Sequence, residues 1–362
     1  MSGGVDSSVA AALLVKAGYD CVGMTMRVAS GEGRESSDKA CCTLDAAQDA
    51  RRVCDTLGIP HYVVNYIDRF EREVISDFIR EYQAGRTPNP CSRCNQRVKF
   101  GALYEKAMAV EADYIATGHY VRRAEINGRV ALRRGLDTRK DQSYTLAGLG
   151  QDQLRRALFP VGEHDKSAVR EIARDLGLVT ADKPESQEIC FVPDDNYRNF
   201  LVSRLGAPKP GPIVTTLGEV LGTHKGLMYY TIGQRRGIDL AAERPLYVVR
   251  IDVDRNALVV GFEEETYCRS LSACEVTWSG NSPGSGPFDC LVQLRAHHNP
   301  AGATVSPCDD GFRVDFHEPE RSVTPGQWAV LYDKDGHVLA GGIIETFESC
   351  AARASLSETA TR

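Results

Sequence analysis

Apolar residues in the first 120 positions alternate between helical spacing and the continuous runs of buried strands. Val9, Leu13 and Leu14 recur at helical spacing up to Gly18, and the apolar run 21–26 then predicts a strand. The same alternation continues with helices over 44–57, 70–82 and 103–110 and with strands over 61–64 and 114–117. Alternation of this kind predicts an α/β domain, in which helices cover a parallel sheet.

Beyond position 206 the helical spacing disappears, and short apolar runs separated by Gly and Pro take its place. These runs cover 246–251, 257–260, 312–316 and 329–332. Short strands of this kind are typical of small sandwiches and barrels, so we expect two small β-rich domains. The predicted boundaries are 1–205 for the α/β domain, 206–270 for a central β-rich domain, 271–352 for a C-terminal β-barrel and 353–362 for a flexible tail.

Composition and charge narrow the class of protein. The chain has 362 residues, a net charge of −6 and a pI near 5.8, which argue against a protein that coats nucleic acid nonspecifically. There is no signal-peptide pattern and no apolar stretch near the ~20 residues that span a bilayer, so we expect a cytoplasmic protein without membrane contact. In that reducing compartment the 12 cysteines are not expected to form a disulfide framework. Those interpreted as small buried hydrophobes are Cys21, Cys54, Cys268, Cys274, Cys290, Cys308 and Cys350.

The segment Ser2-Gly3-Gly4-Val5-Asp6-Ser7-Ser8 stands directly before a helical pattern. Its glycines allow close approach to a phosphate, its hydroxyls are donors, and the helix N-terminus adds a dipole. It lacks the lysine of a Walker A loop, so transfer of a terminal phosphoryl group is not expected. The segment resembles the PP-loop of the ATP pyrophosphatases, which cleave ATP between its α and β phosphates. That superfamily has a strand ahead of the loop, whereas here Met1 adjoins it, and we expect the numbered chain to lack a sheet strand or to begin at an internal Met.

Two cysteine-containing segments supply candidate nucleophiles. Residues 87–95 are interpreted as a proline-stiffened loop before a helix, where nearby arginines and the helix start favour a thiolate at Cys94. Cys190 lies in a second polar connector. A structural zinc at Cys91 and Cys94 would need a second cysteine pair at similar spacing, and none follows. An iron–sulfur cluster on Cys91, Cys94 and Cys190, with one iron left open to bind sulfide, is a competing interpretation.

Six groups of residues together resemble one family, the tRNA-specific 2-thiouridylases. They are SGGVDSS (2–8), GRTPNP with the following cysteines (85–95), ATGHY (116–120), KDQSY (140–144), GLMY with GQR (226–235) and TPGQ (324–327). They occur in the family's order and cover nearly the whole chain. A PP-loop alone indicates only the superfamily, whereas this combination indicates the thiouridylase branch.

The resemblance implies a transferase that uses ATP and Mg²⁺ to replace the 2-oxygen of the wobble uridine in tRNA with sulfur. ATP adenylates that oxygen, in tRNAs reading Lys, Glu and Gln codons. Cys190 receives sulfur as a persulfide from a cysteine desulfurase or a sulfur-carrier protein, and that sulfur attacks the activated carbon directly or after release as sulfide. Cys94 attacks the persulfide to release the sulfur. A transient Cys94–Cys190 disulfide results, and a reductant must reopen it. In the alternative sulfur chemistry, a [4Fe-4S] cluster binds the sulfide.

The same resemblance assigns further site residues. Met26 lines the adenine pocket, and Gly118 brings backbone close to ATP. The positions that match tRNA contacts are Asn89, Pro90, Cys91, His119, Lys140, Asp141, Gln142, Arg295 and Gln327. Two departures stand out, since Cys91 replaces an acidic residue proposed as a proton carrier in some relatives, and 296–298 differ from the usual aromatic and basic run.

A basic hairpin and two rival functions complete the sequence interpretation. Six arginines between 122 and 139, with Lys140, surround an Asn127-Gly128 hairpin signal and are either a phosphate-binding face or an ordinary charged hairpin. Another ATP pyrophosphatase, such as an amide ligase or a different tRNA thiolase, would keep the loop with a different nucleophile. A noncatalytic RNA-binding protein with a metal clip would bind tRNA without consuming ATP.

Overall fold

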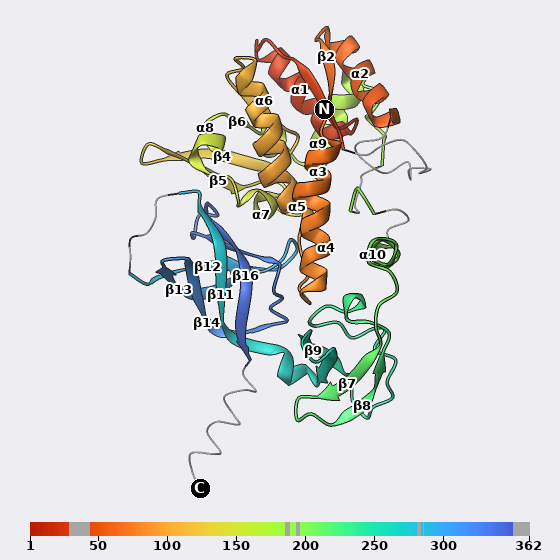
Figure 1. The fold of residues 1–362 in the computed structure, drawn as a ribbon. Helices are drawn as coiled ribbons and strands as arrows, with labels where there is room; N and C mark the ends of the chain where they lie inside the picture. Colours follow the sequence, from red (N-terminus) through yellow and green to blue (C-terminus); the bar gives the residue numbers. More distant parts are fainter. Residues whose placement is uncertain (29–43, 185–188, 193–195, 281–283, 285, 350–362) are drawn as a thin grey trace. The chain divides into compact units, whose positions relative to one another are not determined.

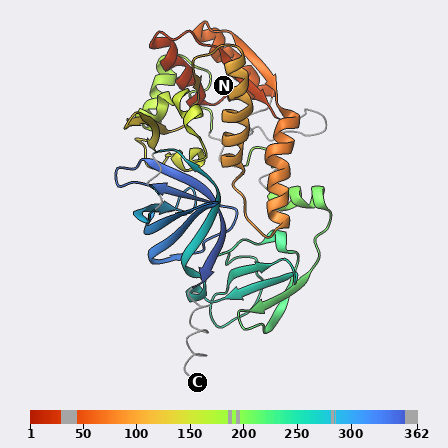
Figure 2. The same ribbon diagram turned by 60° about the vertical axis from the view of Figure 1, so that its left-hand side comes forward.

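A computed structural model of the chain divides into two compact units (Figure 1; Figure 2). It describes residues 1–28, 44–184, 189–192, 196–280, 284 and 286–349. The first unit comprises Met1–Ser76, Pro90–Tyr197 and Asp335–Val338, and the second comprises Asp77–Asn89, Arg198–Lys334 and Leu339–Arg362. The tail predicted over 353–362 lies outside the described residues.

Parallel strands and the helices packed on them form the first unit. Its first elements are α1 (Val5–Lys16), β1 (Gly23–Arg27), α2 (Leu44–Leu57) and β2 (His61–Asn65). β1 and β2 pair in parallel, with Gly23 opposite His61, and β3 (Ile115–Ala116) pairs in parallel with β6 (Ala157–Leu158). Val9 of α1 and Val169 of α9 (Lys166–Asp175) are fully buried in one core. The predicted α/β class with parallel strands is therefore confirmed.

Two long helical segments each contain a π-helical stretch. One runs through α3 (Ile67–Phe70), η1 (Glu71–Ile75) and α4 (Ser76–Gln83), and the other through α5 (Pro90–Arg93), η2 (Cys94–Ala102) and α6 (Leu103–Ala109). The loop predicted over 87–95 is thus wrong from Pro90 onward. Proline suits the first position of a helix, because its φ is already helical and the N–H that it lacks would have no partner there.

In the first unit, an antiparallel hairpin adjoins short helices. β4 (Val121–Ile126) pairs with β5 (Arg129–Arg134), and the connecting Asn127 and Gly128 have φ of 51° and 74°. Two positive φ values are those of a type I′ turn, so the predicted hairpin is confirmed. The short helices are α7 (Ser143–Leu146), α8 (Gln151–Arg155) and η3 (Pro160–Glu163).

The second unit contains a four-stranded sheet in the order β8-β7-β10-β9. Its elements are α10 (Tyr197–Leu205), β7 (Gly211–Thr215), β8 (Val220–His224), η5 (Leu227–Tyr229), β9 (Tyr247–Asp252), β10 (Ala257–Gly261) and η6 (Glu263–Thr266). Alternate side chains face one core, where Ile213, Val248 and Leu258 are buried. β10 is buried along its whole length, and burial of apolar side chains is the main source of stability for such a small sheet.

A closed barrel in the order β11-β14-β13-β12-β15-β16 completes the second unit, and Figure 2 shows its strands in teal to blue. The strands are β11 (Tyr267–Trp278), β12 (Phe288–Gln293), β13 (Ala301–Cys308), β14 (Gly311–Arg321), β15 (Trp328–Tyr332) and β16 (Val338–Ser349). Leu271, Val292, Val305 and Phe312 fill its interior. The predicted pair of β-rich domains is confirmed, and the boundaries proposed for them stay predictions.

In the part of the chain that the structure describes, no helix combines the length and the apolar character that crossing a bilayer requires.

Candidate active site

The Ser2–Ser8 loop is held in a fixed shape by its own hydroxyls. The Ser2 N–H donates to Ser7 Oγ at 3.1 Å, and the hydroxyls of Ser7 and Ser8 donate to the Gly4 carbonyl at 3.1 and 2.9 Å. α1 begins at the next residue, Val5, and no side chain caps its first turn. The backbone N–H groups of that turn are therefore positioned to receive an anion.

Two glycines, one in this loop and one outside it, allow close contacts between the loop and neighbouring backbone. Gly3 has φ of 66°, and a β-carbon there would lie 2.3 Å from the Ala46 carbonyl oxygen. A β-carbon on Gly118 would lie 2.5 Å from both the Asp6 carbonyl carbon and the Ser7 nitrogen. Gly118, for which the family resemblance predicts a contact with ATP, thus lies directly against the Ser2–Ser8 loop.

The carboxylate of Asp6 belongs to a network that sequence reasoning missed. Lys166 Nζ donates to its two oxygens at 2.7 and 2.9 Å, and the Tyr120 hydroxyl donates to one of them at 2.7 Å. The Lys166 ammonium also lies 5.5 Å from the centre of the Tyr120 ring. Asp6 therefore carries a paired charge at the first turn of α1. The sequence offered only a weak signal, an Asp165 N-cap that places Lys166 at the start of α9.

Met26 lies near the end of β1, opposite Val64 of β2, and is half-buried. This position is near the C-terminal end of β1, the edge at which parallel α/β sheets bind nucleotides. Its assignment to the adenine pocket stays a prediction.

Cys91 and Cys94 lie on the helix that begins at Pro90. Cys91 is exposed and Cys94 is half-buried. Residues three apart are neighbours on one helix face, so the two thiols share a face. Asn95 anchors this helix, because its side-chain amide donates to the Thr145 carbonyl in α7 at 3.1 Å.

Cys190 is half-buried in a short turn, in which the Val192 N–H donates to the Ile189 carbonyl at 2.9 Å. The ring of the next residue, Phe191, lies 5.8 Å from that of Phe70 in α3. η2, which begins at Cys94, packs against the same helix. Both candidate nucleophiles therefore adjoin segments that contact α3. Part of the motif around Cys190, residues 185–188, lies outside the described residues.

His119 is buried between Phe100 and Phe159, with ring centres 6.4 and 6.5 Å away. Its Nδ1 shares a hydrogen bond of 2.8 Å with Thr117 Oγ1. Burial first, and then the charge of Lys99, lower the pKa of His119 well below its ordinary value. The imidazole is consequently neutral at physiological pH.

The 140–142 loop is tied to Tyr120. Gln142 accepts the Tyr120 N–H at 2.9 Å through Oε1, and its own N–H donates to the Tyr120 carbonyl at 3.0 Å. Asp141 accepts from the N–H groups of Gly135 and Ser143. Lys140 is half-buried. These bonds fix the loop beside the residue that also contacts Asp6.

The basic hairpin uses part of its charge internally. Arg122 Nε donates to the Arg134 carbonyl at 2.7 Å, and Arg133 Nε donates to the Asp335 carbonyl at 3.2 Å. Arg123 and Arg139 are exposed. The phosphate-binding interpretation of this hairpin stays a prediction.

Three positions predicted to contact tRNA belong to the second unit: Asn89, Arg295 and Gln327. Arg295 is exposed and lies in a turn. Its backbone carbonyl accepts hydrogen bonds from the His298 N–H and the Gln293 side-chain amide, each at 3.0 Å. Gln327 donates through Nε2 to the carbonyls of Thr87 and Pro88 at 2.8 and 3.3 Å. Asn89 follows these two residues and is half-buried.

The cysteines interpreted as small buried hydrophobes differ in burial. The prediction is wrong for Cys308, which is exposed because it ends β13 at a turn, and Cys21 and Cys274 are only half-buried. Cys54, Cys268 and Cys290 are buried, and desolvation raises the pKa of Cys290 to about 12. Cys350 lies outside the described residues.

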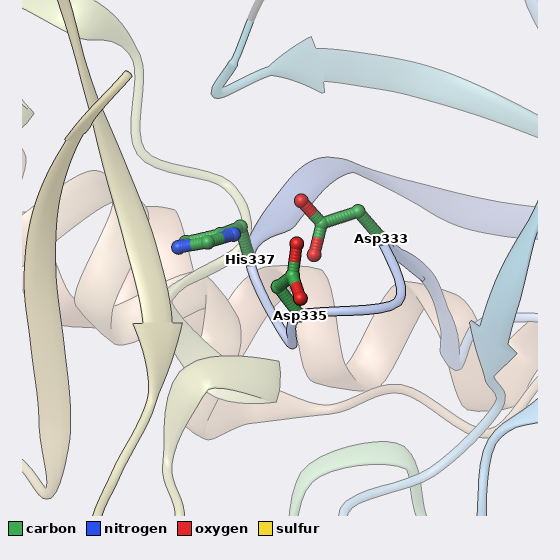
Figure 3. A group of neighbouring side chains, drawn as sticks. All are labelled: Asp333, Asp335 and His337. Carbon is green, nitrogen blue, oxygen red and sulfur yellow. The ribbon is translucent and has the colours of Figure 1, made fainter.

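A possible cation site occurs in the turn that joins β15 to β16. The ligand atoms of Asp333, Asp335 and His337 lie within 4.8 Å of one another (Figure 3). Exposed acidic groups commonly occur without an ion, so we assign no role to this group. Among the described residues, Cys91, Cys94 and Cys190 do not form a set this compact.

Comparison with known proteins gives matches over nearly the whole chain. Three family models match in succession: tRNA methyl transferase HUP domain (residues 1–194), tRNA methyl transferase PRC-barrel domain (198–262) and aminomethyltransferase beta-barrel domain (268–344). The tRNA-specific 2-thiouridylase MnmA of Symbiobacterium thermophilum is 50% identical over 356 residues, which cover 95% of this chain and 90% of that protein. The protein of the same name from Pelotomaculum thermopropionicum is 48% identical over 351 residues, which cover 96% of each chain.

A solved structure, the NMN synthetase from Francisella tularensis, matches 57% of this chain and 74% of that chain with 20% identity. Its TM-score is 0.32, and it carries no argument about this protein.

Proposed function

The chain belongs to the tRNA-specific 2-thiouridylase family, and we propose that it is a transferase that thiolates the 2-position of the wobble uridine in tRNA. The observation that carries this proposal is an anion-binding loop bordered by Gly118, in a chain similar along 95% or more of its length to relatives of that name. The loop supplies the ATP chemistry, and the cysteines supply the sulfur chemistry.

We assign the triphosphate of ATP, with Mg²⁺, to the Ser2–Ser8 loop and the first turn of α1. Backbone N–H groups there face the anion, and Gly3 and Gly118 remove side chains from its path. Since Asp6 is already paired with Lys166, its charge repels the phosphates less than an isolated carboxylate would. Adenylation of the uridine 2-oxygen converts a poor leaving oxygen into AMP and releases pyrophosphate.

Sulfur is assigned to Cys190 as a persulfide, supplied by a cysteine desulfurase or a sulfur-carrier protein. The Cys94 thiolate attacks Cys190 Sγ, so that the outer sulfur leaves as sulfide and a Cys94–Cys190 disulfide forms. Sulfide then attacks the adenylated carbon and expels AMP. A two-electron reductant must reopen the disulfide before the next turnover.

The tRNA is assigned to the second unit through Asn89 and Arg295, and to the first unit through Pro90, Cys91, His119 and residues 140–142. The side-chain amide of Gln327 already donates within the protein. Exposed Arg295 offers phosphate a charge that is sensitive to salt. The proposed substrates are the tRNAs that read Lys, Glu and Gln codons, and the proposed location is the cytoplasm.

Mass spectrometry of nucleosides tests this function. Unmodified glutamate tRNA is incubated with the full chain, ATP, Mg²⁺ and a persulfide donor, with omission of ATP as the control. The expected product is 2-thiouridine, formed only with ATP. Cys190→Ser is expected to abolish the product while tRNA binding persists, and normal product from that variant would remove the persulfide assignment.

An iron–sulfur mechanism remains a second candidate, because exposed Cys91 shares a helix face with Cys94. Iron and activity are to be measured in aerobic and anaerobic preparations. Activity that depends on about four irons per chain would support the cluster. An anaerobic sample that is active without iron would reject it.

A further inference from the structure

The residues that lead into the Cys91–Cys94 helix are held by the barrel. Residues 85–89, here called the entry loop, belong to the second unit and directly precede Pro90. The Thr87 N–H donates to the Pro325 carbonyl at 2.9 Å. Gln327 Nε2 donates back to the carbonyls of Thr87 and Pro88. Three backbone groups of the entry loop are therefore bonded by two residues of one turn.

Gly326 allows this contact. It has φ of 91°, and a β-carbon there would lie 3.0 Å from the nitrogen, the carbonyl carbon and the oxygen of Thr87. Only a residue without a side chain both adopts this φ readily and lets the two backbones approach so closely. We call residues 325–327 the clamp.

The clamp is itself fixed to the barrel. The Gly326 N–H donates to the Ile344 carbonyl at 2.9 Å, and the Ile344 N–H donates to the Gln327 carbonyl at 2.8 Å. Ile344 belongs to β16 and is fully buried. The backbone of Gly326 and Gln327 is thus fixed to a strand of the barrel.

Residues that adjoin the strands of the four-stranded sheet contact the other side of the entry loop. Thr87 Oγ1 donates to Thr231 Oγ1 at 3.1 Å. A β-carbon on Gly85, whose φ is 69°, would lie 2.7 Å from a methyl group of Val253. The loop therefore contacts both β-rich parts of the second unit, and its backbone is immobilised before the chain continues into Pro90.

We propose that the clamp positions the catalytic segment, and that Gln327 is a positioning residue whose amide fixes the path of 87–88 and hence the start of the Cys94 helix. The effect of the clamp on kcat for thiolation rests on the proposed function. Both N–H donors of the Gln327 side chain bond to the entry loop. Its main contribution to thiolation is therefore to position Asn89, Pro90 and Cys94.

Two variants of the full chain remove the donors while preserving side-chain length: Gln327→Glu and Gln327→Met. In the free protein, amide hydrogen exchange over residues 84–90 is expected to be at least about tenfold faster in both variants. Alkylation of Cys94 by iodoacetamide, followed by mass spectrometry, is expected to change by about threefold or more. Arg295→Ala is the control, because Arg295 is exposed and outside the clamp, and both measurements should match the unmodified chain.

Kinetics separate positioning from direct tRNA contact. With saturating tRNA and ATP, kcat for thiolation is expected to fall about tenfold in both Gln327 variants, whereas the Kd for tRNA stays within about twofold. Arg295→Ala should show the reverse pattern. Unchanged exchange over 84–90, or a raised Kd with unchanged kcat, would overturn the proposal. If the unmodified chain makes no 2-thiouridine, the proposed function fails. Amide hydrogen exchange over 84–90 and alkylation of Cys94 would still show whether the clamp positions this segment.

Discussion

Gly118→Ala is expected to weaken ATP binding through steric contact alone. Gly118 does not have a positive φ, so alanine suits its backbone, yet its β-carbon would lie 2.5 Å from Asp6 and Ser7 backbone atoms. An ordinary carbon contact needs roughly 3.5 Å, so the phosphate loop must move by about 1 Å. Displacement of this size costs about 1–3 kcal/mol in a packed site, which corresponds to a loss of affinity of roughly fivefold to 150-fold.

Calorimetric titration with a nonhydrolysable ATP analogue and Mg²⁺ measures this loss. Gly150→Ala is the matched control, because Gly150 has φ of −84° and a β-carbon there would lie 4.0 Å from its nearest neighbour, Gln153 Oε1. The control should bind the analogue as the unmodified chain does. A folded Gly118→Ala protein with unchanged affinity would refute the assignment of this loop to ATP.

The remaining predictions concern stability and thiol reactivity. Lys166→Met and Asp6→Asn are each expected to lower the free energy of unfolding by about 1–2 kcal/mol, and urea denaturation of the double variant should show coupling of at least about 0.5 kcal/mol; additive losses would contradict the pairing. The folded-state pKa of His119 is lowered, so stability is present above the unfolded pKa and is lost as pH falls below about 6.5. Between pH 7.5 and 5.5 the unmodified chain should therefore lose more stability than His119→Gln in urea denaturation, and equal losses would count against a buried neutral imidazole. With iodoacetamide at pH 8, exposed Cys308 should be alkylated well before Cys290, whose pKa is about 12. If Cys290 reacted first, the conclusion that its thiol is buried and protonated would be wrong.

Local sequence signals predicted the elements well. Gly18 has a positive φ after α1, which is the backbone conformation expected where the predicted helix ends. Asn127-Gly128 likewise formed the expected turn. These features depend on neighbouring residues, so the sequence pattern contains the information that determines them.

Contacts between distant segments were beyond the sequence pattern. Nothing near Asp6 indicates that Lys166 and Tyr120 surround its carboxylate, because the pairing depends on how α9 packs on α1. Gln327 was assigned to tRNA, and only the structure shows its amide bonded to the entry loop. The 87–95 segment was interpreted as a loop because its prolines and asparagines favour turns, although Pro90 equally well starts a helix.

The helical start at Pro90 limits how this chain can vary. Loops tolerate inserted residues, whereas one residue added within a helix turns everything beyond it by about 100° and shifts it by about 1.5 Å along the axis. An insertion between Pro90 and Cys94 would carry Cys94 to a different face of its helix while Pro90 stayed in place. The residues between Pro90 and Cys94 are therefore expected to tolerate substitution far better than insertion or deletion.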